Sequence, residues 1–250
     1  MNRPRVNLCG VWIDNGSMQE AVENVDRLIR DKQRAYVVTP NVDHIVRLQW
    51  DKEFRRVYEN AALVLADGAP LLWAARYLGT PLMEKISGSD LTPALCEMAA
   101  AQGHKIFFLG GREGTAQESK EVLEKRYPGI RIVGVYSPPM GFEKNETECQ
   151  KILSMLRQTS PNILFVGLGT PKQENWICRN GEQLPVAVSI GIGATFEFMS
   201  NRVRRAPVWM QRWGLEWFWR LLMEPGRLWK RYLVDDPKFF WFVWKQKRSQ

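Results

Sequence analysis

Short apolar segments alternate with amphipathic segments from near the start of the chain to about residue 195. The apolar runs occupy residues 5–13, 35–39, 63–66, 105–109, 130–136, 162–167 and 186–190. Successive positions in these runs are apolar, which is typical of strands covered on both faces. Such strands separated by helices favour an α/β fold with a Rossmann-like, doubly wound, mostly parallel sheet. We therefore predict one α/β domain over residues 1–200.

Local signals place two of the intervening helices. Ser17 followed by Glu20 forms a capping box, which predicts a helix from there to about Lys32. A charged stretch over residues 115–126 predicts another helix, directly after a glycine-rich turn.

The pattern changes after residue 194, and residues 201–250 are predicted to form an appendage of three short amphipathic helices. Pro207 is placed to open the first helix, which would bring three tryptophans spaced by four residues to one face: Trp209, Trp213 and Trp217. Acidic residues followed by proline, at 224–225 and 236–237, mark two further helix starts. This appendage has no core of its own, so we expect it to dock on the body, on a membrane, or on both.

Charge and tryptophan are concentrated in this appendage. Residues 202–248 hold twelve of the 35 Lys and Arg but only four of the 27 Asp and Glu. The rest of the chain therefore holds 23 basic and 23 acidic side chains and has no net charge. They also hold seven of the eleven Trp. Basic side chains and indoles together suit the interface of an anionic bilayer. A docked helix also buries aromatics routinely, so packing on the body is the alternative for each Trp.

Other features limit the location of the protein. No signal peptide and no apolar stretch long enough to span a bilayer is evident. We expect a cytoplasmic protein that is peripheral on the inner face of the plasma membrane. The four cysteines form no CxxC pair, which argues against a zinc site or a disulfide framework.

The candidate chemistry lies at strand ends, because open parallel sheets bind ligands at their carboxyl edge. Asp67 directly follows a buried run and would act as a general base if burial raised its pKa. An Asp-Gly turn that merely starts the next helix is an equal alternative. Thr39 and Asn41 are placed to orient a ligand hydroxyl, although Asn41 serves equally well as a helix N-cap. His44 is not included, since a lone histidine is usually structural.

Two glycine-rich turns are further candidates. Gly110 and Gly111 precede a helix and suit phosphate binding by backbone N–H groups, although such turns are common without a ligand. In the stretch 167–174, Gly169 permits close backbone approach and Gln173 is expected to face the cleft. The alternative for this stretch is a capping box formed by Thr170 and Gln173. Neither a GxGxxG fingerprint nor a Walker loop is present.

These pieces together resemble the WecG/TagA/CpsF family of bacterial glycosyltransferases over nearly the whole chain. The matching motifs, in order, are Thr39-Pro40-Asn41, Leu65-Ala66-Asp67-Gly68, Ser87-Gly88-Ser89-Asp90-Leu91, Phe108-Leu109-Gly110-Gly111, Gly167–Glu174, Gly193-Ala194-Thr195-Phe196-Glu197-Phe198, Arg204-Arg205-Ala206-Pro207, Gly214-Leu215-Glu216-Trp217 and Arg220–Arg227.

The resemblance implies an enzyme that transfers a sugar, with inversion, from a UDP-sugar to a polyprenyl-diphosphate-linked saccharide. The implied donor carries N-acetylmannosamine, its uronic acid or a hexose, and the product belongs to cell-surface polysaccharide or teichoic acid synthesis. No DxD motif occurs, so we expect no metal and no other cofactor. The expected partners are the UDP-sugar, the lipid-linked acceptor and an anionic membrane surface. The apolar tail also allows self-association into a homo-oligomer, and no nucleic acid is expected.

The resemblance also implies roles for single residues. Asp67 is the base, and Thr39, Asn41 and Gln173 line the sugar and acceptor pocket. The tail supplies cations for the diphosphates, namely Arg220, Arg227 and Lys230 or Arg231. The tail would thus supply the positive charge that a divalent metal ion supplies elsewhere, and it would complete the site only at the membrane.

Two positions depart from the family pattern. Lys85 stands where arginine is usual, which weakens a bidentate phosphate contact. Glu197 stands where aspartate is common, so a contact to ribose or base must adjust by one methylene. Both departures concern substrate binding rather than the fold.

Two other functions are compatible with parts of the sequence. A nucleotide-dependent oxidoreductase would share the doubly wound sheet, but the turn at residues 14–17 lacks the dinucleotide fingerprint. A basic nucleic-acid-binding protein would share the aromatic and basic tail. The helical spacing of the tail tryptophans and the balanced charge of the body disfavour it.

Overall fold

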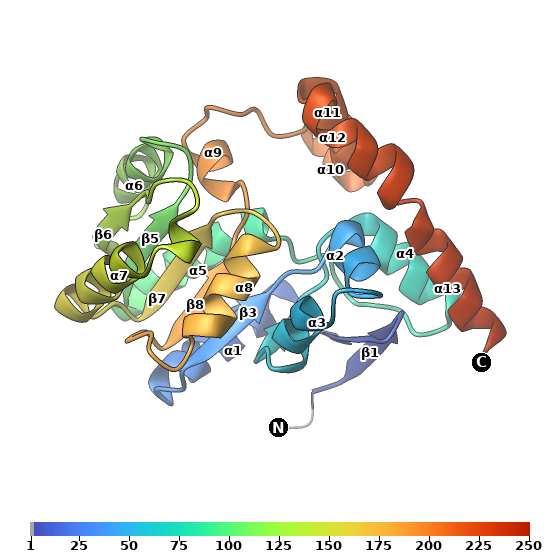
Figure 1. The fold of residues 1–250 in the computed structure, drawn as a ribbon, viewed down its shortest axis with the longest axis horizontal. Coiled ribbons are helices and arrows are strands. Elements are labelled where there is room, and N and C mark those ends of the chain that lie inside the picture. Colours follow the sequence, from blue (N-terminus) through green and yellow to red (C-terminus); the bar gives the residue numbers. More distant parts are fainter. Residues whose placement is uncertain (1–2) are drawn as a thin grey trace.

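A parallel sheet forms the centre of the computed structural model, which describes residues 3–250 except for the side chain of residue 212 (Figure 1). Its six strands, counted over the described residues, run in the order β4-β3-β8-β7-β5-β6, and every pairing is parallel. The strands are β3 Ala35–Val38, β4 Leu63–Val64, β5 Lys105–Gly110, β6 Arg131–Tyr136, β7 Ile163–Gly167 and β8 Val188–Gly191. The predicted Rossmann-like α/β fold is confirmed.

Helices cover both faces of this sheet (Figure 1). The helices of the body are α1 Met18–Arg30, α2 Val42–Arg47, α3 Lys52–Glu59, α4 Ala69–Tyr77, α5 Gly88–Gln102, α6 Thr115–Arg126, α7 Glu146–Thr159, α8 Lys172–Asn180 and α9 Thr195–Met199, with the short 3-10 helix η1 Phe142–Lys144. Along β5, Ile106 and Phe108 pack in the core with α1, α5 and α6, whereas Phe107 and Leu109 pack in the core with α7 and α8. The apolar runs are therefore continuous because each strand is buried on both sides.

The two helix predictions are confirmed closely. Ser17 and Glu20 make both bonds of the capping box, and α1 ends at Arg30, two residues before the expected end. The charged helix α6 has the predicted bounds.

The first apolar run is not a strand of the main sheet. Residues 5–13 were expected to form one strand, but the chain forms a separate antiparallel hairpin of β1 Arg5–Leu8 and β2 Val11–Asp14. Cys9 and Gly10 both have positive φ and reverse the chain between the two strands. The Asp14 carboxylate then accepts the N–H of Val64 at 2.8 Å, which fastens the hairpin beside β4.

The tail contains four α-helices rather than the three predicted. They are α10 Val208–Arg212, α11 Glu216–Met223, α12 Pro225–Lys230 and α13 Lys238–Arg248, with a π-helical turn η2 Arg231–Asp235 between the last two. The predicted start at Pro225 is confirmed. The predicted single face of Trp209, Trp213 and Trp217 is wrong, because Gly214, with φ +70°, ends the first helix and Trp217 belongs to the next one.

Both ends of the tail are fastened to the body. Arg202 pairs with Glu118 of α6 at 2.6 Å. At the other end, Phe239 and Val243 of α13 are buried in the cluster that the hairpin, α2, α3 and α4 share. Gln246 accepts the N–H of Cys9 in the hairpin turn and donates to the carbonyl of Asn7 in β1. Figure 1 shows the tail running from α11 down to α13 at the right edge. The expected docking on the body is confirmed. Among the described residues, no helix is both long enough and apolar enough to cross a membrane.

Candidate active site

Loops from five strands meet at the carboxyl edge of the sheet. From β3 the chain goes to β4 at one side of β3. It then crosses to β5 on the other side, so the strand order reverses at β3. Ligands bind at such a reversal in open α/β sheets. Thr39 and Asn41 follow β3, and Asp67 follows β4. Three of the predicted residues thus come from neighbouring strands.

A backbone hydrogen bond fixes Asp67 at the carboxyl edge of the sheet. Its N–H donates to the carbonyl of Pro40 at 2.8 Å, which links the ends of β3 and β4. The next helix, α4, has Gly68 as its N-cap and no side-chain cap, so the Asp67 carboxylate does not serve as a helix cap. Burial raises the pKa of Asp67 to about 7; Lys85 and Arg220 lower it, while Glu216 and Asp90 raise it. A carboxylate with such a pKa is suited to general base catalysis near neutrality.

A cluster of four charges connects this edge to the tail. Lys85 Nζ lies 2.9 Å from Glu216 Oε2 of α11 and 3.5 Å from Asp90 Oδ2 of α5. Arg205 Nη1 lies 2.6 Å from Asp90 Oδ1, and Arg205 Nε lies 3.2 Å from Glu216 Oε1. Each side chain is between 20% and 30% exposed. Each cation in the cluster therefore binds both a body carboxylate and the tail carboxylate.

A pocket opens beside this cluster, between α9 and the helices α11 and α12. Five arginines and three glutamates are among its lining residues, which are Arg112, Ala194, Glu197, Phe198, Val203, Arg204, Arg205, Ala206, Glu216, Trp219, Arg220, Met223, Glu224 and Arg227. Glu197 Oε2 is buried without a hydrogen-bond partner within residues 3–250. A ligand hydroxyl bound in this pocket would supply the hydrogen bond that this buried oxygen lacks.

The tail cations predicted for the diphosphates lie in three places. Arg220 and Arg227 line the pocket. Lys230 is exposed at the end of α12. Arg231 instead donates to Asn41 Oδ1 at 3.1 Å, and its Nε lies 3.9 Å from Asp43 and 3.8 Å from Asp236. The tail therefore contacts the end of β3 as well as the pocket.

Asn41 caps a helix and also contacts the tail, whereas its expected orientation of a ligand hydroxyl stays a prediction. Its side chain caps α2 by accepting the N–H of His44 at 3.3 Å, so the N-cap alternative is confirmed. The same oxygen accepts from Arg231, which places it between the sheet edge and the tail. Thr39 is buried, with 8% of its surface exposed.

The first glycine turn is closely packed. The N–H of Gly111 donates to the carbonyl of Gly167 at 2.7 Å. A Cβ on Gly110 would lie 2.5 Å from that same oxygen. These glycines allow β5 and β7 to approach at their ends, and the Gly111 N–H already has a partner there. Phosphate binding at this turn stays a prediction.

The second glycine turn is organised by Gln173, which is only 3% exposed. Its Oε1 accepts the N–H of Gly169 at 3.2 Å and of Gly193 at 3.0 Å. Its Nε2 donates to Glu174 Oε1 at 2.8 Å. The capping-box alternative is wrong, because no side chain caps α8 and Thr170 donates to Glu174 instead. A direct contact of Gln173 with substrate stays a prediction.

Sequence reasoning did not single out several residues of the site. Asp90, Arg205 and Glu216 occur in the family motifs, but no role was assigned to them. Arg112 and Arg204 also line the pocket. The repeated arginines at 204–205 were the available signal, yet only the fold shows which carboxylates they meet.

The described residues contain no group of three or more His, Cys, Asp or Glu side chains that could hold a metal ion. The expectation of a metal-independent reaction stays a prediction.

Comparison with known proteins shows the family of the chain. Residues 6–250 match the family model described as "Glycosyl transferase WecG/TagA/CpsF family". An N-acetylglucosaminyldiphosphoundecaprenol N-acetyl-beta-D-mannosaminyltransferase from Bacillus spizizenii is 33% identical over 215 residues, which cover 86% of this chain and 80% of the relative. A protein of the same name from Staphylococcus aureus strain MW2 is 28% identical over 252 residues, which cover 99% of this chain and 95% of the relative. The chain therefore belongs to the WecG/TagA/CpsF family of glycosyl transferases and is a glycosyltransferase.

Proposed function

We propose that this enzyme transfers N-acetylmannosamine, or a related sugar, from a UDP-sugar to N-acetylglucosamine carried on undecaprenyl diphosphate. The acceptor and N-acetylmannosamine follow the names of the two relatives. The observation that carries the proposal is Asp67, whose pKa is about 7 and is influenced by Glu216 and Arg220, two residues that line the arginine-rich pocket. This reaction supports the synthesis of a cell-wall polymer.

In the proposed mechanism Asp67 takes the proton of the acceptor hydroxyl. The acceptor oxygen forms a bond to the anomeric carbon as the bond from that carbon to the UDP oxygen breaks. Attack from the face opposite UDP inverts the configuration at the anomeric carbon. The base then lies on one side of the sugar and the leaving diphosphate on the other.

The arginine-rich pocket supports this arrangement. Arg220 and Arg227 face the space that the diphosphate of UDP would occupy, and charge-assisted hydrogen bonds would stabilise the developing negative charge. Glu197 contributes the unpaired Oε2, which suits the hydroxyl groups of a ribose. Lys85 stays close enough to Asp67 to influence its pKa, so it also contributes positive charge there.

The tail surface supports work at a membrane. Six of its seven tryptophans are more than one third exposed, namely Trp209, Trp213, Trp217, Trp229, Trp241 and Trp244. Trp219 is the half-buried exception and donates to the carbonyl of Arg204 at 3.0 Å. Packing on the body does not account for the six exposed rings. We propose that they enter the headgroup region of an anionic bilayer, where the lipid-linked acceptor resides.

A transfer assay tests the proposal. Purified enzyme is incubated with UDP-N-acetylmannosamine, UDP-glucose and UDP-glucuronate in turn, each with a short-chain polyprenyl-diphosphate N-acetylglucosamine. We expect one UDP-sugar to be turned over at least tenfold faster than the others, with unchanged rate in excess EDTA. NMR of the product is expected to show inverted configuration. Absence of transfer from every UDP-sugar, or retained configuration, would overturn the proposal.

Vesicle sedimentation tests the membrane contact separately. The chain is expected to sediment with vesicles of phosphatidylglycerol and phosphatidylcholine but not with phosphatidylcholine alone, since anionic lipid attracts the basic tail. Substituting Trp209 and Trp213 by serine should weaken sedimentation without changing transfer to a water-soluble acceptor. Equal sedimentation of wild type and variant would contradict this part of the proposal.

A further inference from the structure

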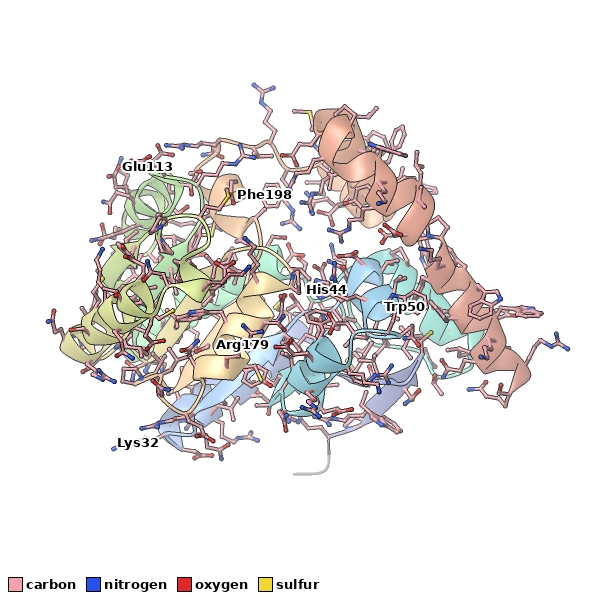
Figure 2. All side chains as sticks on the ribbon, in the orientation of Figure 1. Lys32, His44, Trp50, Glu113, Arg179 and Phe198 are labelled. Atoms are coloured by element: carbon pink, nitrogen blue, oxygen red, sulfur yellow. The ribbon has the colours of Figure 1, made fainter. Side chains whose placement is uncertain are left out.

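A row of hydrogen-bonded side chains, three of them buried, includes Thr170 of the loop that follows β7. His44 Nδ1 is 2.6 Å from the Tyr58 hydroxyl, and His44 Nε2 is 2.6 Å from Thr170 Oγ1. Thr170 in turn donates to Glu174 Oε1 at 3.2 Å. Tyr58, His44 and Glu174 are 6%, 4% and 3% exposed. Figure 2 shows His44 near the centre of the molecule, on α2.

With an ionised Glu174, one arrangement of hydrogens fills all three contacts of this row. In this arrangement the Thr170 hydroxyl donates its hydrogen to Glu174, so the Thr170 oxygen accepts from His44 Nε2–H. A neutral imidazole carries one N–H, so Nδ1 must accept the hydrogen of Tyr58. Burial, together with Arg231 and Arg47, lowers the pKa of His44 to about 3, which keeps the ring neutral. Each donor in the row therefore has one acceptor.

The row ends on the amide of Gln173. Because Glu174 Oε1 accepts from Gln173 Nε2, the amide cannot turn over, and Gln173 Oε1 points away from that carboxylate. This oxygen accepts the N–H groups of Gly169 and Gly193. Gly169 lies in the loop after β7 and Gly193 in the loop after β8. One side-chain amide thus joins two loops at the edge where the site lies.

We propose that Tyr58, His44, Thr170 and Glu174 are positioning residues, which fix the Gln173 amide and through it the two loops in the geometry that sugar transfer needs. This inference rests on the proposed function. The row does not reach the reacting atoms. Misplacement of a site by about 1 Å can cost on the order of 100-fold in rate. A row that only stabilised the fold would alter thermal stability and leave kcat unchanged.

Substitution at Thr170 tests the role in transfer. Thr170→Val has nearly the same shape but no hydroxyl, whereas Thr170→Ser keeps it. We expect Thr170→Val to lower kcat by about tenfold to 100-fold with KM for the UDP-sugar within about twofold, and Thr170→Ser to restore most of kcat. Thr159→Val is the matched control, because Thr159 on α7 donates only to the carbonyl of Met155. Wild-type kcat in Thr170→Val, or equal losses in the valine and serine variants, would overturn the inference.

Imidazole NMR tests the row without relying on transfer. The chain has two histidines, so His104→Gln leaves His44 as the only signal. We expect the Nε2–H tautomer to persist down to pH 5, with a slowly exchanging ring N–H that Thr170→Val exposes to exchange. A His44 that titrates between pH 6 and 7, or that carries its hydrogen on Nδ1, would overturn the inference.

The two proposals fail in distinguishable ways. If the wild type transfers no sugar, the proposed function is wrong, and the row is judged by the amide resonances of Gly169 and Gly193. Shifts of these resonances in Thr170→Val but not in Thr159→Val support the row. Unchanged resonances in Thr170→Val overturn it.

Discussion

At the residue scale, Asp67 shows why position alone does not define a base. An aspartate after a strand is common, and most such residues are solvated or cap a helix. Here the helix N-cap is Gly68, and burial with neighbouring acids moves the pKa of Asp67 to about 7. The same burial that makes the carboxylate basic enough to take a proton also makes its ionised form costly for the fold.

This cost predicts a stabilising substitution at the site. The pKa of Asp67 is about 7 in the folded protein and about 3.9 in an unfolded chain. Between these values the folded state holds a proton that the unfolded state has lost, so stability decreases as pH rises from about 4 to 7. An asparagine at this position carries no charge at any pH. We therefore expect Asp67→Asn to raise Tm by a few degrees at pH 8 and by much less at pH 5. Calorimetry at both pH values is the measurement; an unchanged or lower Tm at pH 8 would contradict it.

At the element scale, helix α11 brings two opposing charges to the base. Glu216 raises the pKa of Asp67, and Arg220 on the next turn of the same helix lowers it. Glu216 is held there by Lys85 and Arg205. The tail helix therefore adjusts the electrostatics of the sheet edge as well as lining the pocket.

A pair of variants measures this electrostatic coupling. In the wild type we expect kcat/KM to rise with pH to a plateau, with a midpoint at about 7, since Asp67 must lose its proton to act as base. Lys85→Met removes a charge that lowers the pKa of Asp67, so the midpoint should move up. Glu216→Gln removes a charge that raises it, so the midpoint should move down. Midpoints that move in the same direction in both variants would argue against Asp67 as the titrating base.

The turn between α10 and α11 depends on one glycine. Gly214 has φ +70°, and a Cβ there would lie 2.7 Å from Ala69 Cβ and 2.9 Å from the Trp73 ring. Gly214→Ala is therefore expected to displace the tail from α4, with faster limited proteolysis of the tail and a lower kcat. Gly226→Ala is the control, because a Cβ at Gly226 has nothing within 4 Å. Equal proteolysis of the two variants would count against this turn as a docking point.

Prediction from sequence was most accurate where local rules act alone. The capping box at Ser17 and the bounds of α6 follow from short-range signals, and the buried strands follow from apolar runs. The hairpin was missed because its turn at Cys9 has a positive φ that a cysteine rarely adopts. The first tail helix was predicted too long because Gly214, with φ +70°, ends it before Trp217.

The site was predictable in part for a related reason. Residues that directly follow strands, such as Thr39, Asn41 and Asp67, could be placed by fold class alone. Contacts between distant segments could not be predicted, because no local sequence signal connects Arg205 with Asp90 or Arg231 with Asn41. Those contacts depend on where the tail docks.

At the scale of the whole molecule, the tail is both a part of the core and a part of the site. Phe239 and Val243 fill the cluster beneath the hairpin. Removing residues after about 200 would therefore expose this cluster besides removing Arg220 and Arg227. Charge substitutions on α11 and α12 separate the two effects better, because they leave α13 in place. The enzyme thus combines a sheet body whose charges balance with a basic helical segment that closes one side of the pocket.

The central claim is that Asp67 deprotonates the acceptor while the arginines of the tail bind the diphosphate. The most direct measurement compares single-turnover transfer and UDP affinity in Asp67→Asn and in the double variant Arg220→Gln, Arg227→Gln. We expect Asp67→Asn to slow transfer by about 100-fold or more with unchanged UDP affinity, and the arginine variant to weaken UDP binding. Transfer by Asp67→Asn at the wild-type rate would contradict the account.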